Sequence, residues 1–299
     1  MRRLAALLVL VLLAWPPPAL AQAKDPVRRI AVISAFDPEI TVLEAQTTDK
    51  ARFTVNGVVF VTGRLMGKDV VLFLSGVSMV NAAMTTQMAL DRFTIDRIVF
   101  SGIAGGVDPN LDVGDVVVAD QWAQYLEVVM ARQTPTGFDP GGRGHADYAN
   151  FGMMFPSEVA LARGDQERER RFWFPSDPMM LATAREVAAH ATLKRCIADR
   201  CLVKEPRVVV GGNGVSGAAF VDNAQLRDWA YATFQARVLD METAAVGHVA
   251  YVNKVPYIAF RSQSDLAGGD PGDNQARTFF QLASDNSAAV VLAFLKALP

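Results

Sequence analysis

Three carboxylates in this 299-residue chain stand where apolar stretches give way to loops or helices. Glu242 belongs to the motif LDMET, Asp265 ends the motif FRSQSD, and Glu39 follows the apolar stretch RRIAVISAF. A carboxylate at such a point is costly to remove from water unless it is paired or used. Each side chain could simply cap a helix, whereas carboxylates at a ligand-binding edge could transfer protons or bind hydroxyl groups.

The elements expected around Glu242 and Asp265 bring both residues to such an edge. Apolar residues recur at three- and four-residue spacing from Ala244 to Val252, which predicts a helix after Glu242. The run YIAF at 257–260 is short and rich in strand-forming residues, so it predicts a strand that leads to Asp265. In open α/β sheets, ligands bind at the carboxyl ends of the strands.

The first half of the chain alternates between expected strands and helices. Residues 28–36 predict a buried strand, and Asp37 and Pro38 then suit the N-cap and first turn of a helix that carries Glu39 near its start. A second helix is expected from about residue 79. Further strands are expected at 58–62, 69–74, 97–100 and 113–118.

Motifs for bound cofactors are missing from the sequence. The Gly-rich turn SGIAGG at 101–106 lacks the spacing of a dinucleotide fingerprint or a P-loop, and it is followed by a strand. It either brings backbone close to a small ligand or serves only as a turn. The three histidines, His145, His190 and His248, lack metal-ligand spacing. We therefore expect no cofactor and no metal ion.

The second half of the chain contains a long interruption. Residues 121–174 are rich in Gly, Pro and charge, and we expect a mostly irregular insertion that docks through its aromatic side chains. Asp177 and Pro178 then repeat the N-cap pattern and predict a helix to about residue 191. A strand at 207–210 and a helix at 277–298 follow, so the whole pattern predicts a single α/β domain.

The first 21 residues have the layout of a secretory signal peptide. Two arginines precede an apolar run, a Pro break and Ala19-Leu20-Ala21, and we expect cleavage after Ala21. The mature chain, residues 22–299, is then expected to be periplasmic or secreted and free of the membrane. In an oxidising compartment we expect Cys196 and Cys201 to form a local disulfide rather than two buried free thiols.

The composition excludes one class of partner. Hydrophobic residues make up 51% of the chain and the formal net charge is −2. A nucleic-acid-binding protein would normally present a basic face, so we expect no nucleic-acid partner.

Six motifs in a fixed order give the chain a resemblance to a known family. The chain resembles the nucleoside phosphorylase/nucleosidase superfamily, and most of all the 5′-methylthioadenosine/S-adenosylhomocysteine nucleosidases and their exported relatives. The motifs are AFDPEI, SGVSMVNAA, SGIAGGVDPNLDVGDVVV, VSGAAFV, LDMETAAVGHVA and FRSQSD. The resemblance implies a three-layer α/β/α single domain with a central mixed sheet, cleavage of the N-glycosidic bond of purine nucleosides, and a homodimer.

The resemblance also places the three carboxylates in one reaction. It implies that Asp265 is the general acid that protonates the leaving purine and that Glu39 activates the attacking water. Glu242, with Met241 beside the sugar, would bind the ribose hydroxyl groups. Breaking a C–N glycosidic bond requires an acid at the base, stabilisation of an oxocarbenium-like sugar and a base for water. Three carboxylates at one edge are therefore better explained by catalysis than by helix capping.

The remaining positions implied by the resemblance contact the substrate. Phe220 corresponds to the aromatic residue that stacks on the purine, and Val221 would reach the edge of the purine through its backbone. Three further substrate-binding positions fall within SGIAGG, at Ile103, Ala104 and Gly105.

Two departures from the family keep other functions open. Ile103 stands where the family usually has a hydroxyl residue, and Ala218 stands where many nucleosidases have an acidic residue. A phosphorylase must hold a phosphate dianion with cations, but residues 75–79 contain no arginine and only Arg64 is a candidate. We therefore expect water as the co-substrate. The alternatives are a phosphate-dependent purine nucleoside phosphorylase and a non-catalytic nucleoside-binding or storage-type homologue.

Overall fold

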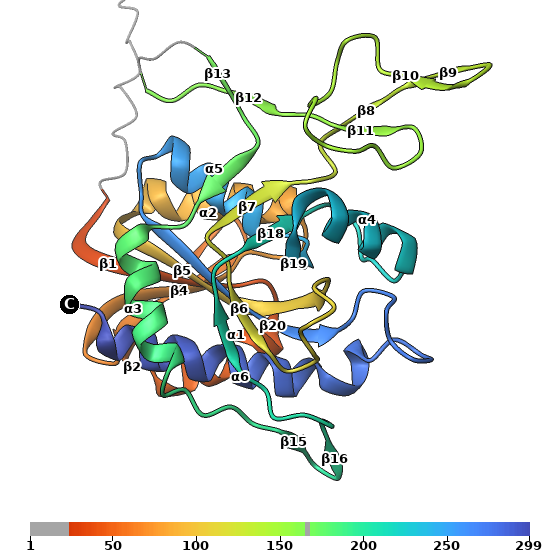
Figure 1. The fold of residues 1–299 in the computed structure, drawn as a ribbon. Helices are drawn as coiled ribbons and strands as arrows, with labels where there is room; N and C mark the ends of the chain where they lie inside the picture. Colours follow the sequence, from red (N-terminus) through yellow and green to blue (C-terminus); the bar gives the residue numbers. More distant parts are fainter. Residues whose placement is uncertain (1–23, 165–167) are drawn as a thin grey trace, which may run out of the picture.

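A twelve-stranded mixed sheet forms the middle layer of the molecule (Figure 1). The computed structural model describes residues 24–164 and 168–299, so the expected signal peptide lies outside the described residues. The strands of this sheet are β1 (Asp25–Ser34), β2 (Thr48–Val55), β3 (Val58–Leu65), β4 (Lys68–Leu74), β5 (Phe93–Gly106), β6 (Val116–Val118), β7 (Gln121–Gln124), β14 (Trp173–Pro175), β17 (Val208–Val210), β18 (Asn213–Ser216), β19 (Ala236–Asp240) and β20 (Tyr257–Asp265).

The strand order combines parallel and antiparallel pairs. The main path runs β14-β7-β18-β19-β5-β1-β4-β3-β2, and β20 pairs with β5 and β6 off this path. The strand β5 is parallel to β1 and β20 but antiparallel to β19. The expected central mixed sheet is therefore confirmed.

Helices cover both faces of the sheet (Figure 1). They are α1 (Asp37–Gln46), α2 (Met79–Arg92), α3 (Pro178–Ala188), α4 (Ala224–Phe234), α5 (Thr243–Val252) and α6 (Ala276–Ala297). Helices α1 and α3 pack with α6 over one face, whereas α2 and α5 pack together over the other. The structure therefore has the three-layer α/β/α architecture that the resemblance implied.

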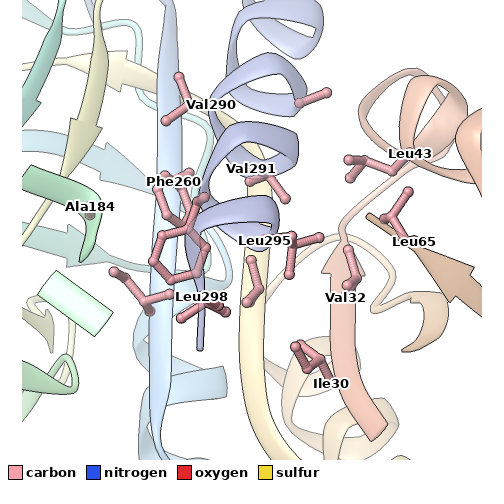
Figure 2. Close-up of a cluster of buried hydrophobic side chains, with 14 of the residues drawn as sticks. Ile30, Val32, Leu43, Leu65, Ala184, Phe260, Val290, Val291, Leu295 and Leu298 are labelled. Carbon is pink, nitrogen blue, oxygen red and sulfur yellow. The ribbon is translucent and has the colours of Figure 1, made fainter. Parts of the chain in front are cut away.

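The core on the α6 side joins β1 to the helix α6 (Figure 2). Val291 and Leu295 of α6 pack with Val32 of β1, Leu43 of α1 and Phe260 of β20, all fully buried. By length and composition alone α6 could cross a membrane, but 61% of its most apolar window is buried inside the molecule. We therefore interpret α6 as a core helix.

The segment 121–174 is more regular than we expected. Its two ends are β7 and β14, which pair with each other in the main sheet, and Trp122 is fully buried there. Tyr148, Phe151 and Trp173 dock, as expected, against the aromatic core at α4. Between the ends lie three small strand pairs, β8 (Val128–Met130) with β11 (Met154–Pro156), β9 (Arg132–Thr134) with β10 (Gly137–Asp139), and β12 (Val159–Leu161) with β13 (Glu169–Arg171). Three-residue strands are too short to show a periodic pattern, so the sequence analysis did not predict them.

Two local expectations were wrong. Asp37 is the first residue of α1 and Phe36 is its N-cap, without a capping hydrogen bond from a side chain. Residues 101–106 form the end of β5 rather than a turn. By contrast, Asp177 caps α3 as expected and accepts a hydrogen bond from the backbone N–H of Met180.

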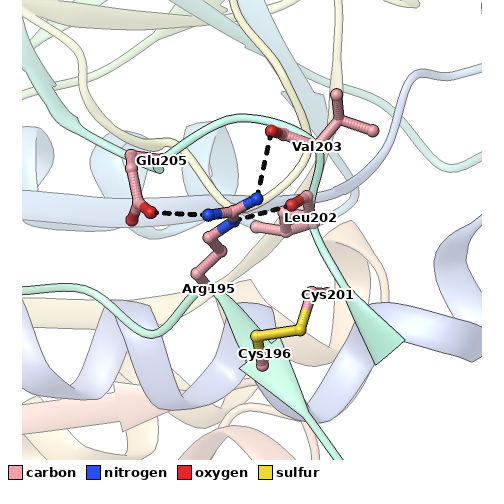
Figure 3. The surroundings of a disulfide bond; sticks show 6 residues. All are labelled: Arg195, Cys196, Cys201, Leu202, Val203 and Glu205. Atoms are coloured by element: carbon pink, nitrogen blue, oxygen red, sulfur yellow. Dashed lines mark hydrogen bonds and ion pairs between the residues drawn. A yellow bond between two sulfur atoms is a disulfide. The ribbon is translucent and has the colours of Figure 1, made fainter. Parts of the chain in front are cut away.

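The two cysteines form the expected disulfide (Figure 3). Cys196 and Cys201 join the two short strands of a hairpin, β15 (Cys196–Ile197) and β16 (Arg200–Cys201). The neighbouring Arg195 donates hydrogen bonds to the backbone carbonyl of Leu202 and to Glu205. Leu202 packs on Phe279 and Leu282 of α6, so the hairpin is attached to the α6 side of the molecule.

Candidate active site

One cavity of about 230 Å³ is lined by all nine residues that the resemblance assigned to the site. Several elements meet there: the first turn of α1, the ends of β5 and β20, the β19–α5 junction and the loop after β18. The nine residues are Glu39, Ile103, Ala104, Gly105, Phe220, Val221, Met241, Glu242 and Asp265. The sequence motifs are far apart in the chain, and the sheet brings them together.

Glu39 is buried in the wall of the cavity, where backbone groups hold its carboxylate. Its side chain is 1% exposed, and the backbone N–H groups of Ala35 and Ile103 donate to its two oxygens at 2.6 and 2.7 Å. Burial raises the pKa of Glu39, although the nearby Arg261 and these hydrogen bonds oppose the rise. A carboxylate with a raised pKa is a stronger base once it is ionised.

Arg261 organises the site, and the sequence analysis gave it no role. It is fully buried, with its guanidinium 2.7 Å from Asp240, 3.4 Å from Glu242 and 3.6 Å from Glu39. A side chain at Gly102 would clash with this group, because an added Cβ would lie 2.0 Å from Nη1 of Arg261. The signal in the sequence was an arginine inside an apolar strand, since buried arginines require partners.

Three carboxylates share this single buried cation. Burial, aided by the charge of Asp240, raises the pKa of Glu242 to about 7 despite the opposing effect of Arg261. Oε1 of Glu242 also accepts a hydrogen bond from the backbone N–H of Ser78 at 2.8 Å. Asp240 is in turn held by the hydroxyl groups of Ser216 and Thr243. Glu242 is thus held at the cavity wall, where its carboxylate oxygens can accept hydrogen bonds from hydroxyl groups.

Asp265 occupies a separate part of the wall. Its Oδ1 accepts from the backbone N–H of Ala267 and its Oδ2 from the hydroxyl of Ser264, both at 2.8 Å. Burial raises the pKa of Asp265, and the nearby charge of Asp270 adds to the effect. Such an environment favours the protonated form that a general acid needs.

Three aromatic side chains line the cavity, those of Phe36, Phe220 and Phe280. Phe220 is 62% exposed, so it is not a core residue, while Val221 beside it is buried. Phe36 and Phe280 also line the cavity and contact each other edge to face, with ring centroids 6.0 Å apart. The sequence analysis missed these two because their position depends on contact between α1 and α6.

Cations for phosphate are missing from the cavity lining. No Lys or Arg is among the described residues that line it. Arg64 lies at a different pocket and pairs with Asp69 at 3.8 Å. Among residues 24–164 and 168–299, no group of His, Cys, Asp and Glu side chains is arranged to hold a metal ion. The expectation that no metal takes part stays a prediction.

The three-layer α/β/α fold and the carboxylate-lined cavity at the strand ends agree with the family to which the sequence belongs. The family model described as the phosphorylase superfamily matches residues 29–296, and the chain belongs to that superfamily. Within it, the chain is 30% identical over 268 residues to the 5′-methylthioadenosine/S-adenosylhomocysteine nucleosidase of a Marinomonas species, covering 89% of this chain and 98% of that protein. It is 29% identical to the nucleosidase of the same name from Tolumonas auensis, over 90% of this chain and 100% of the relative.

Solved structures give the same result for the fold. The structure of such a nucleosidase from Colwellia psychrerythraea in complex with adenine superposes with a TM-score of 0.68 at 26% identity, covering 90% of this chain and 95% of that one. A futalosine hydrolase of Helicobacter pylori also superposes, with a TM-score of 0.66, 23% identity and coverage of 91% and 99%. The second likeness shows the fold alone.

Proposed function

We propose that this protein hydrolyses the N-glycosidic bond of purine nucleosides and releases the free base. Nucleosides of the methylthioadenosine and S-adenosylhomocysteine type are the first candidates, because the similar curated proteins carry those names. The observation that carries the proposal is the pairing, in one cavity, of a buried acid with a separate carboxylate cluster. Asp265 has its pKa raised by burial, whereas Glu39 and Glu242 surround the buried Arg261.

The reaction follows from the chemistry of these groups. Asp265 donates its proton to N7 of the purine while the C1′–N9 bond breaks and its electron pair goes to the base. Glu242 binds the ribose hydroxyl groups as positive charge develops on the sugar. Glu39 takes a proton from water as the water oxygen bonds to C1′. One nucleoside and one water give one purine and one free sugar.

Water suits this cavity better than phosphate does. A phosphate dianion requires cationic or multiple N–H donors, and no Lys or Arg lines the cavity in the described residues. Arg261 lies behind the carboxylates and is already surrounded by three of them.

The test is base release from methylthioadenosine, S-adenosylhomocysteine, adenosine and inosine, in phosphate-free buffer and again with phosphate. We expect free sugar without phosphate, and loss of turnover with retained binding in Asp265→Asn. The matched control is Asp228→Asn, whose carboxylate is exposed on α4. Strict dependence on phosphate would instead indicate a phosphorylase. Nucleoside binding without base release in either buffer would indicate a binding protein.

We also propose a homodimer through the outer face of α2 and the turn that precedes it. Val77, Val80 and Met84 are 45%, 79% and 53% exposed, which is unusual for a row of apolar side chains. Val77 also lines the catalytic cavity, so a second copy on this face would close the site. Val80→Glu is expected to give monomers with a raised KM. Sedimentation of the unmodified protein as a monomer at micromolar concentration would refute the dimer.

Export is the third part of the proposal. We propose that residues 1–21 are removed and that the mature protein acts in the periplasm or outside the cell. The disulfide between Cys196 and Cys201 supports this, since such bonds persist in oxidising compartments. The intact mass of protein purified from the expressing cells is expected to match a chain that starts at Gln22. An unprocessed chain would contradict the proposal.

A further inference from the structure

The side chain of Asn274 connects three segments around the cavity. Asn274 lies in the stretch between β20 and α6. Its Nδ2 lies 3.4 Å from Oδ1 of Asp265 and 3.2 Å from Oδ1 of Asp222. Its Oδ1 accepts a hydrogen bond from the backbone N–H of Ala276, the first residue of α6, at 2.9 Å. One amide therefore contacts the candidate acid, the base-binding loop and the start of a helix.

Building on the proposed hydrolysis, we propose that Asn274 is a positioning residue that fixes the carboxyl group of Asp265 relative to the loop that holds the base. Asp222 directly follows Phe220 and Val221, the residues placed at the purine. Because Asp222 and Asp265 share this donor, the acid is linked to the loop that binds the purine, and the purine is the group that accepts its proton. Proton transfer requires heavy-atom separations near hydrogen-bonding distance, so a small displacement of either segment is costly.

The hydrogen bonds also distinguish the two oxygens of Asp265. Oδ1 faces two N–H donors, from Ala267 and Asn274, and can only accept from both. Oδ2 has the hydroxyl of Ser264 as its partner, which can rotate and leaves a lone pair free. The arrangement therefore places the transferable proton on Oδ2. Without the amide of Asn274, this distinction rests on Ala267 alone.

The charges around Asp265 determine how the pKa of its carboxyl group changes when the amide of Asn274 is removed. Asp270 and Asp222 lie on the adjoining loops, and Glu39 and Glu242 line the same cavity. Arg227 adds a positive charge on this side of the cavity and donates to the carbonyl of Gly106. An N–H donor stabilises the carboxylate form, so its removal among acidic groups raises the pKa of Asp265.

Two substitutions separate positioning of the acid from the hydrogen bond that Asn274 accepts at the start of α6. Asn274→Ala removes both the donor and the acceptor. Asn274→Asp keeps an oxygen for the N–H of Ala276 but removes the donor, and an aspartate side chain makes the same turn with the backbone two residues on as asparagine does. The matched control is Asp273→Asn, because Asp273 is the exposed neighbour. Each full-length mature variant is characterised by thermal melting, steady-state kinetics over pH, and carbon-13 titration of the aspartate carboxyl groups, with Asp265→Asn assigning the signal.

We expect both Asn274 variants to reduce kcat by about 10-fold, with a smaller change in KM, since hydrogen bonds to charged groups have effects of that order. The pKa of Asp265 is expected to rise by about one unit, which moves the alkaline limb of the pH profile upward. Asn274→Asp is expected to raise this pKa further than Asn274→Ala does, because it places a new carboxylate beside Asp222 and Asp265. Asp273→Asn is expected to leave the kinetics, the melting temperature and the titration unchanged.

Two results would overturn the proposal. If Asn274→Asp restores the kcat that Asn274→Ala loses, the residue only stabilises the start of α6. If the carbon-13 titration of Asp265 is the same in all variants, the amide does not hold the acid. Absence of base release by the unmodified protein would refute the hydrolase instead, and the titration would still decide the role of Asn274.

Discussion

Replacement of Arg261 by methionine tests whether the buried cation holds the carboxylate cluster together. Methionine retains most of the volume and the packing on the ring of Phe100, over which the guanidinium lies at 4.0 Å. The guanidinium of Arg261 lies 2.7–3.6 Å from the carboxylates of Glu39, Asp240 and Glu242. The substitution therefore leaves three buried carboxylates without the cation that they share. Removing one partner of a buried ion pair costs about 3–5 kcal/mol. For a domain of this size, the melting temperature would fall by about 6–20 °C.

The stability that Arg261→Met loses is expected to grow with pH, because the carboxyl groups around Arg261 ionise as the pH rises. Glu39 and Glu242 already have pKa values above their ordinary value, mainly through burial, and removal of Arg261 raises both further. A carboxyl group whose pKa is raised in the folded state takes up a proton on folding. It therefore lowers the free energy of unfolding increasingly as the pH rises from its pKa in the unfolded chain to its pKa in the folded protein. The difference between Arg261→Met and the unmodified protein should therefore be large at pH 8 and smaller at pH 5.

Urea unfolding followed by circular dichroism at both pH values is the appropriate measurement. The matched control is Arg185→Met, whose side chain is 55% exposed and pairs with Asp120 at 3.2 Å. An exposed ion pair of this kind contributes less than about 1 kcal/mol. If Arg261→Met resembles the control, or loses the same stability at pH 5 and pH 8, the electrostatic account of the site is refuted.

Three further outcomes are expected. Glu39→Gln should lower kcat by about 10²–10⁴-fold with nucleoside affinity retained, as measured by kinetics and calorimetric titration, and a normal kcat would remove Glu39 from the mechanism. Gly102→Ala should cost about 1–3 kcal/mol in urea unfolding and reduce turnover, because its Cβ would lie 2.0 Å from Arg261. The double variant Cys196→Ser/Cys201→Ser should lose at most about 2 kcal/mol, since the closed loop is short, with unchanged kcat. A large loss of turnover there would mean that the hairpin supports the site.

The sequence alone predicted an α/β domain and the chemical groups of the candidate site, and the resemblance of its motifs to a known family implied the three layers. The alternation of apolar runs predicted the strands and helices around Glu242 and Asp265, and β20 extends from the expected strand to Asp265 itself. Residue types at the strand–loop junctions identified the carboxylates, because such groups require a partner or a use. The local signals were sufficient here since each depends on only a few neighbouring positions.

The tertiary structure decided how these groups act on one another. Arg261 meets Glu39 from a segment more than 200 positions away, and no periodic pattern encodes that contact. The strand conformation of residues 101–106 likewise depends on glycines that leave room for Arg261 and Gln263 from the adjacent β20. The raised pKa values of Glu242 and Asp265 arise from burial, which exists only when the distant segments pack. Desolvation and long-range pairing are properties of the folded geometry, so the sequence supplied the acids and the fold determined their protonation.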